Sequence, residues 1–230
     1  MKLFVVMPAY NESDSVINCI LLTKQILKEK NWDFHIQVID DGSSDNTYSL
    51  VEKITDEYIS IEKLPKNMGK GYAVKTGVLN SKDSSIVAYM DSDLDISPSY
   101  LNLYAEFIQN NIADMVLGSK LHPLSKVNYP NTRKYLSRVF YFFVKFILGA
   151  TVSDSQVGLK VMNGEMARTV FQNLKTNGFA FDLEVIQKFQ KSGARVLEQP
   201  VEINHSWDSR IGIKNSLQAL WQVIKLRNRI

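Results

Sequence analysis

One short stretch near the middle of the chain most restricts its fold. Residues 86–90 form the apolar run Ile-Val-Ala-Tyr-Met, and Asp91, Asp93 and Asp95 follow at once. An apolar run without polar alternation is typical of a strand buried on both faces, as in the interior of a parallel sheet. Ligands of such sheets bind where the strands end. The stretch therefore predicts an α/β protein with a site at the end of this strand.

The three aspartates occupy alternate positions, so an extended chain would bring them within reach of one point. Like charges this close repel unless a cation lies between them. Oxygen ligands suit Mg²⁺ or Mn²⁺, which shares its coordination with the phosphates of a substrate. We therefore expect Asp91, Asp93 and Asp95 to be metal ligands. The competing interpretation is a solvated acidic turn that caps a helix starting near Pro98.

Strands and helices alternate through the first 120 residues. We expect strands at 3–7, 36–39, 59–64, 86–90, 115–119 and 196–203, and helices at 13–27, 45–58, 70–78, 98–110, 164–173 and from 181 onward. Residues 153–160 are polar and then strand-like. This alternation predicts an open, mostly parallel sheet with helices on both faces.

Polar side chains suited to a nucleotide sugar follow the predicted strands. Tyr10 suits stacking on a base, Glu12, Asp40 and Asp41 suit base and ribose hydroxyls, and Lys70 suits a phosphate. Taken singly, each belongs to an ordinary turn or loop. Because the carboxyl ends of parallel strands meet at one edge of a sheet, together they favour a donor site there.

Charge is divided unevenly along the chain. Residues 1–114 contain 17 of the 24 acidic and 10 of the 27 basic side chains, and the ranges 115–153 and 209–230 contain no acid. Such segregation indicates a polyanionic partner or surface. Because no recognition-helix, zinc or RNP pattern is present, we expect no nucleic-acid partner.

Two basic segments, 132–148 and 213–229, have the pattern of amphipathic helices. Their aromatic and basic faces favour a position in the interface of an anionic membrane, although the first helix would also suit packing on the sheet. No run of about 18–20 uncharged apolar residues occurs, no signal peptide is recognisable, and the single cysteine fits a reducing compartment. We therefore expect a cytoplasmic protein that is peripheral on the cytoplasmic face of a membrane.

Four motifs, in this order along the chain, resemble the signature of family-2 glycosyltransferases with the GT-A fold. They are Pro8-Ala9-Tyr10-Asn11-Glu12, Asp40-Asp41-Gly42-Ser43, Asn67-x-Gly69-Lys70-Gly71 and Asp91-Ser92-Asp93. Two later motifs are similar to the polyprenyl-phosphate branch, especially dolichyl-phosphate β-glucosyltransferases, with the polyprenyl-phosphate mannosyltransferases as close relatives. These are Asp154-x-Gln156-x-Gly158-x-Lys160 and Phe181-Asp182-x-Glu184.

The chain departs from this branch in two ways. Many relatives have an arginine after Gly-Ser at the end of the fifth strand, where this chain has Lys120. Lysine keeps the charge but cannot bind a phosphate in a bidentate manner. Members of the branch also often carry transmembrane helices beside the catalytic domain, and no such segment occurs in these 230 residues.

The resemblance implies a role for each matching residue. The donor nucleotide would be held by Pro8, Ala9, Tyr10, Glu12, Asp40, Asp41, Lys70, Asp91, Ser92 and Ser137. Arg133, Ser137 and Arg210 would contact phosphates of donor or acceptor. Asp154, Asp182 and Glu184 are candidates for a base or for orienting groups. Residues 1–205 would be the catalytic domain, with a nucleotide-sugar half at 1–120 and an acceptor half at 121–205, followed by a basic helix at 206–230.

The expected activity is metal-dependent transfer of a hexose, with inversion, from a nucleotide sugar to a polyprenyl or dolichyl phosphate. UDP-glucose is the favoured donor. A phosphomonoester is already anionic at neutral pH, since its second pKa is about 6, whereas a sugar hydroxyl needs a base. Two alternatives stay open: transfer to a hydroxyl acceptor in surface-polysaccharide synthesis, and an inactive nucleotide-sugar-binding module.

Overall fold

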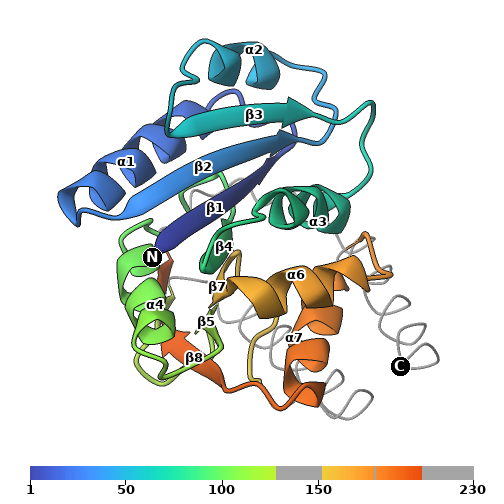
Figure 1. Ribbon diagram of the computed structural model, residues 1–230. Helices are drawn as coiled ribbons and strands as arrows, with labels where there is room; N and C mark the ends of the chain where they lie inside the picture. Colours follow the sequence, from blue (N-terminus) through green and yellow to red (C-terminus); the bar gives the residue numbers. More distant parts are fainter. Residues whose placement is uncertain (128–151, 179, 204–230) are drawn as a thin grey trace.

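The computed structural model describes residues 1–127, 152–178 and 180–203. Within them, seven strands form one sheet in the order β3-β2-β1-β4-β7-β5-β8 (Figure 1). Their bounds are Lys2–Ala9 (β1), Asp33–Asp40 (β2), Ile59–Lys63 (β3), Ile86–Met90 (β4), Met115–Ser119 (β5), Leu159–Asn163 (β7) and Val196–Pro200 (β8). Neighbouring strands are parallel except at β7, which runs antiparallel to β4 and β5. The prediction of an open, mostly parallel sheet is confirmed.

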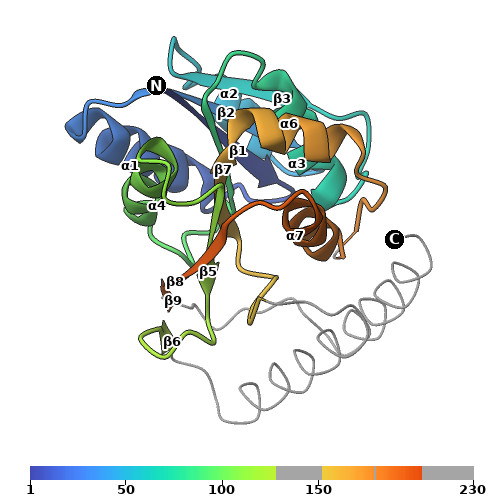
Figure 2. The same ribbon diagram turned by 60° about the horizontal axis from the view of Figure 1, so that its bottom comes forward.

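Helices cover both faces of the sheet (Figure 2). They are α1 (Val16–Glu29), α2 (Thr47–Glu52), α3 (Lys70–Asn80), α4 (Tyr100–Gln109), α6 (Gly164–Gln172) and α7 (Phe181–Lys191). One core lies under α1 and α4, and a second lies under α3, α6 and α7. Successive β4 residues enter the two cores in turn, with Ala88 in the first and Tyr89 in the second. Two-sided burial explains why residues 86–90 lack polar alternation.

Two elements differ from the sequence-based expectation. The helix after Asp45 ends at Glu52 because Asp56 forms a turn, in which its carboxylate accepts the Tyr58 N–H at 2.8 Å. The last predicted strand is divided at Val201. Beyond Pro200 the chain leaves β5, and Val201 bonds instead with Ser125 Oγ and the Lys126 N–H. The chain then enters a separate two-stranded parallel pair of β6 (Lys126–Val127) and β9 (Glu202–Ile203).

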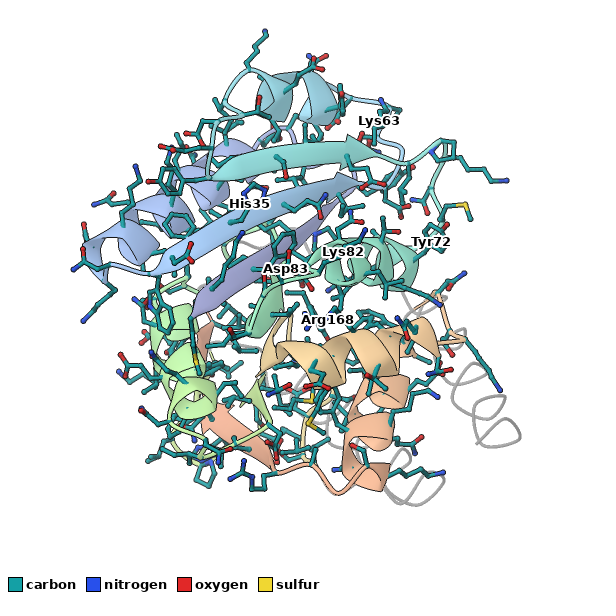
Figure 3. All side chains as sticks on the ribbon, in the orientation of Figure 1. His35, Lys63, Tyr72, Lys82, Asp83 and Arg168 are labelled. Carbon is teal, nitrogen blue, oxygen red and sulfur yellow. The ribbon has the colours of Figure 1, made fainter. Side chains whose placement is uncertain are left out.

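Hydrogen bonds tie the carboxyl ends of the central strands together. The Asp41 N–H, just past β2, donates to the Ala9 carbonyl at 2.8 Å, and Ser92 Oγ, just past β4, donates to the Pro8 carbonyl at 3.3 Å. Figure 3 places Lys63 at the end of β3 and Tyr72 near the start of α3 on this same side of the molecule. The polar motifs predicted to form a site therefore share one edge of the sheet.

Candidate active site at the carboxyl edge of the sheet

The end of β2 presents a buried carboxylate. Asp40 is inaccessible to solvent, and its Oδ1 accepts the Ser43 N–H at 3.0 Å. Its Oδ2 has no hydrogen-bond partner among the described residues, and the Lys63 ammonium lies 3.7 Å away. An acceptor left unpaired at a buried site costs free energy. Asp40 Oδ2 therefore retains the capacity to accept a hydrogen bond at the end of β2.

Asp41 fixes the neighbouring loop. Its two carboxylate oxygens accept the N–H groups of Met68 and Gly69 at 2.7 and 2.9 Å. Burial raises the pKa of the Asp41 carboxyl, and these two hydrogen bonds partly offset that rise. Gly69 has φ +95°, a conformation that favours glycine. Asp41 thus holds the start of α3, where Lys70 is the first residue.

The end of β1 contributes an aromatic ring and a short polar turn. Tyr10 is 42% exposed. The Glu12 N–H donates to Thr47 Oγ1 at 2.9 Å, and the Glu12 carboxylate accepts the Ser15 hydroxyl at 3.1 Å. The structure therefore brings Pro8, Ala9, Tyr10 and Glu12 to the same edge as Asp40 and Asp41, as the sequence predicted.

Asp91, at the end of β4, pairs with a lysine. Its carboxylate forms an ion pair with Lys70 from the start of α3. Burial disfavours the charged form of Lys70, but Asp91 and Asp182 outweigh this effect and raise the pKa of Lys70. The Asp91 N–H donates to the Gly158 carbonyl at 2.9 Å. A Cβ added to Gly158 would collide with the Asp91 carboxylate, so a larger residue there would force that carboxylate to move.

The chain does not stay extended from Asp91 to Asp95, which was the condition for all three aspartates to reach one point. Leu94 has φ +62°, and the Asp95 N–H bonds back to Asp93 Oδ1 at 3.0 Å, so the chain turns after the strand. Among the described residues, no three His, Cys, Asp or Glu side chains are grouped so that they could hold a metal ion. Asp93 as a whole residue is exposed. Partial desolvation of its carboxyl and the charge of Asp91 nevertheless raise the pKa of Asp93 to about 6.

Asp154 lies beyond the end of β5. Its Oδ2 accepts the Lys120 N–H at 3.0 Å, and the Lys120 ammonium lies 3.6 Å from the same oxygen. Glu198 of β8 accepts hydrogen bonds from the Ser153 N–H, the Ser153 hydroxyl and the Asp154 N–H. Sequence reasoning gave Glu198 no role. An acid at the middle of an edge strand is ordinary, and its long-range partners cannot be read from the chain.

The two acids in the first turn of α7 are both buried. Asp182 accepts hydrogen bonds from Lys160 Nζ and Tyr89 Oη, each at 2.6 Å. Glu184 accepts the N–H groups of Lys175 and Thr176 at 3.0 and 2.9 Å. Both carboxylates therefore already have partners within the protein.

Sequence reasoning placed Lys160 in a motif but did not predict its burial. The structure buries Lys160 completely. The available signal was a single lysine between the apolar residues Leu159 and Val161 in a strand-like segment.

The described residues do not include Arg133, Ser137 or Arg210, nor the predicted helices at 132–148 and 213–229.

The comparisons with known proteins agree with this arrangement. The model of the family "Glycosyl transferase family 2" matches residues 4–171. The chain belongs to this family and is a glycosyltransferase.

Among the helices of the described ranges, none has the length and apolarity needed to cross a membrane.

Three similar curated proteins are dolichyl-phosphate beta-glucosyltransferases. The chain is 29% identical, over 96% of its length and 69% of the relative's, to the dolichyl-phosphate beta-glucosyltransferase ALG5C of Trichomonas vaginalis. It is also 29% identical to the dolichyl-phosphate beta-glucosyltransferase of Dictyostelium discoideum, over 99% of this chain and 74% of that one. The mouse protein of the same name is 27% identical over 98% of this chain and 72% of its own.

Solved structures share the fold. Glucosyl-3-phosphoglycerate synthase from Mycobacterium tuberculosis with bound UDP superposes with a TM-score of 0.73 at 17% identity, covering 99% of this chain and 79% of that one. The same enzyme was crystallised with Mn²⁺, UDP and phosphoglyceric acid, and that structure gives a TM-score of 0.71 at 16% identity, with 99% and 77% coverage. These likenesses confirm the GT-A fold.

Proposed function

We propose that this chain transfers glucose from UDP-glucose to a polyprenyl or dolichyl phosphate, with inversion at the sugar C1. The observation that carries the proposal is the Lys70–Asp91 ion pair beside Asp93, at the edge that also holds Asp40 and Tyr10. This edge combines a cation for phosphate oxygens, acids for a metal ion and an exposed ring for a base. Relatives over nearly the whole chain are named dolichyl-phosphate beta-glucosyltransferases.

The donor nucleotide is assigned to the ends of β1 and β2. Asp40 Oδ2 has no hydrogen-bond partner among the described residues, so it would suit an N–H donor of the base. Tyr10 is exposed and suits stacking on the base. Pro8, Ala9, Glu12, Asp41 and Ser92 shape the remaining wall, and Ser137 is a further proposed contact.

The residues at the end of β4 fit a hard divalent cation. Asp91 and Asp93 are close enough for the charge of one to raise the pKa of the other, a repulsion that a cation would relieve. Because these acids do not form a complete ligand set, donor phosphates would supply further ligands. Asp91 and Asp93 would hold the ion, with Asp95 as a third proposed ligand. When bound there, Mg²⁺ or Mn²⁺ supplies positive charge beside the leaving diphosphate.

The acceptor phosphate is assigned to the opposite side of the sugar. Its oxygen forms a bond to C1 as the bond from C1 to the diphosphate breaks. At neutral pH this oxygen is already anionic, so the step needs no general base. This agrees with the burial of Asp182 and Glu184, whose carboxylates already accept hydrogen bonds. Lys120, held beside Asp154, is a proposed phosphate contact.

Two arginines outside the described residues complete the proposed acceptor side. Arg133 and Arg210 would bind phosphate oxygens, and the basic segments around them would rest on an anionic membrane at its cytoplasmic face. Each basic side chain near an anionic leaflet contributes about 1 kcal/mol. Such binding is reversible.

The test is a transfer assay with purified protein, radiolabelled UDP-glucose, dolichyl phosphate in detergent and Mn²⁺. We expect label in the organic extract, as a β-linked glucosyl phosphate. Label that appears only when a hydroxyl acceptor is supplied would instead indicate a polysaccharide-type transferase. Binding of UDP without turnover on either acceptor would indicate a binding module. Each of these two outcomes contradicts the proposal.

A further inference from the structure

A lysine and an aspartate are buried together behind the end of β4. Lys160 of β7 is inaccessible to solvent, and Asp182 of α7 is 6% exposed. Lys160 Nζ donates to Asp182 Oδ1, and Tyr89 Oη donates to the same oxygen. Burying an ion pair costs several kcal/mol per ion, and well-packed apolar side chains of similar volume often serve stability equally well. Stability alone therefore does not account for this pair.

The ammonium of Lys160 also makes a second contact, and this one leads to Asp91. Lys160 Nζ donates to the Val157 carbonyl at 2.8 Å, in the turn that precedes β7. The next residue, Gly158, lies directly against the Asp91 carboxylate and accepts the Asp91 N–H. A shift of this turn therefore moves the surface on which Asp91 rests.

The pairing of β4 with β7 brings Tyr89 and Lys160 together. Tyr89 and Lys160 are register partners in the antiparallel pair of β4 and β7, and the Lys160 ammonium lies 5.1 Å from the centre of the Tyr89 ring. Lys160 thus bonds to α7 and to the turn before β7, and it contacts the Tyr89 ring of β4, two residues before Asp91.

We propose that Lys160 is a positioning residue for the donor site: its bonds to the Val157 carbonyl and to Asp182 hold the turn that orients the Asp91 carboxylate. Asp182 then serves as the counter-charge of Lys160. This inference rests on the proposed function, in which Asp91 is a donor-site residue.

The experiment separates positioning from stability with two variants. Lys160→Met leaves Asp182 buried without its cation, and we expect its melting temperature to fall by about 10 °C. The triple variant Tyr89→Phe/Lys160→Met/Asp182→Leu replaces the whole group by apolar side chains. We expect the triple variant to recover most of the lost melting temperature but to bind UDP, measured by calorimetry with and without Mn²⁺, about tenfold more weakly than the native protein.

A matched control variant lies at the other end of β4. Arg168 of α6 donates to the carbonyls of Ser81 and Ser84, in the loop that also contains Lys82 and Asp83 (Figure 3). Arg168→Met therefore removes a comparable cation-to-carbonyl contact far from the site. We expect it to lower the melting temperature while leaving UDP affinity within twofold of native.

A further variant keeps the inference testable if the triple variant does not fold. Gly158→Ala leaves the ion pair intact but displaces the Asp91 carboxylate, so it should weaken UDP binding by a similar factor. Native UDP affinity in Gly158→Ala, or in a triple variant that melts near the native temperature, would overturn the positioning role alone. Absence of UDP binding by the native protein would overturn the proposed function as well.

Discussion

The ends of β2 and β4 stabilise their acidic groups in two different ways. At β2, Asp40 and Asp41 accept hydrogen bonds from backbone N–H groups of neighbouring loops. At β4 and the adjoining α7, Asp91 and Asp182 are paired with lysines. Backbone donors are fixed by the fold, whereas Lys70, the partner of Asp91, is partly exposed and can change partner. We therefore expect the acids at the end of β2 to contribute more to stability, and those at the end of β4 to contribute more to the proposed activity.

The largest expected effect lies at β4. Asp93→Asn removes a proposed metal ligand, so kcat/KM should fall by about 10²–10³ in the transfer assay with Mn²⁺, the range observed when a group that stabilises transition-state charge is lost. Its melting temperature should not fall, because repulsion from Asp91 is relieved. The matched control is Asp83→Asn, an exposed acid before β4 (Figure 3), which should leave activity unchanged. Turnover of Asp93→Asn near the native rate would contradict this assignment.

The next largest effect is a loss of stability at the end of β2. Asp41→Ala leaves the N–H groups of Met68 and Gly69 without their acceptor, and the free energy of unfolding in urea should fall by about 3 kcal/mol. Asp91→Ala should cost about 1 kcal/mol or less, since its lysine partner is partly exposed. Equal losses in the two variants would remove the distinction between the strand ends.

A smaller effect concerns pH. The pKa of Asp93 is raised to about 6, above its ordinary value, so the folded protein binds this proton more tightly than the unfolded chain does. Without metal, stability should therefore rise as pH falls from about 6 toward 4, as far as this group contributes. Metal binding requires the carboxylate, so Mn²⁺ should raise the melting temperature more at pH 7.5 than at pH 5.5. An equal Mn²⁺ shift at both values would exclude Asp93 as a ligand.

The smallest effect is expected at Lys63, the lysine beside Asp40 at the end of β2. Lys63 lies 3.7 Å from Asp40 but is about half exposed, so Lys63→Met should change the free energy of unfolding by less than about 1 kcal/mol. UDP affinity should stay within about threefold of native. A loss comparable to that of Asp41→Ala would mean that β2, too, depends on a lysine.

Local patterns predicted the parallel part of the fold. The apolar run at 86–90 and the polar strand ends lie as expected because two-sided burial and edge position follow from short-range pattern and topology rules. The pairing of β7 did not follow from the sequence. Residues 153–160 had a strand-like end, but an antiparallel place between β4 and β5 depends on contacts far apart in the chain.

The candidate site was predicted unevenly for the same reason. Tyr10, Asp40 and Asp91 lie at or just after a strand end, and Lys70 begins the helix after β3, so their meeting at one edge was predictable. The turn at Leu94 and the burial of Lys160 were not, because each depends on a specific hydrogen bond. A charged side chain in an otherwise apolar strand signals either an exposed face or a buried partner, and only tertiary structure distinguishes the two.

The central place of β7 has a consequence for the order of synthesis. A nascent chain that ends after Ser119 already contains β4 and β5, yet it lacks the strand that joins them. The same chain also lacks Gly158 and Lys160, which lie behind Asp91. Strands β4 and β5 therefore become joined, and Asp91 gains the residues behind it, only after residue 163 has left the ribosome, and β8 completes the sheet later still.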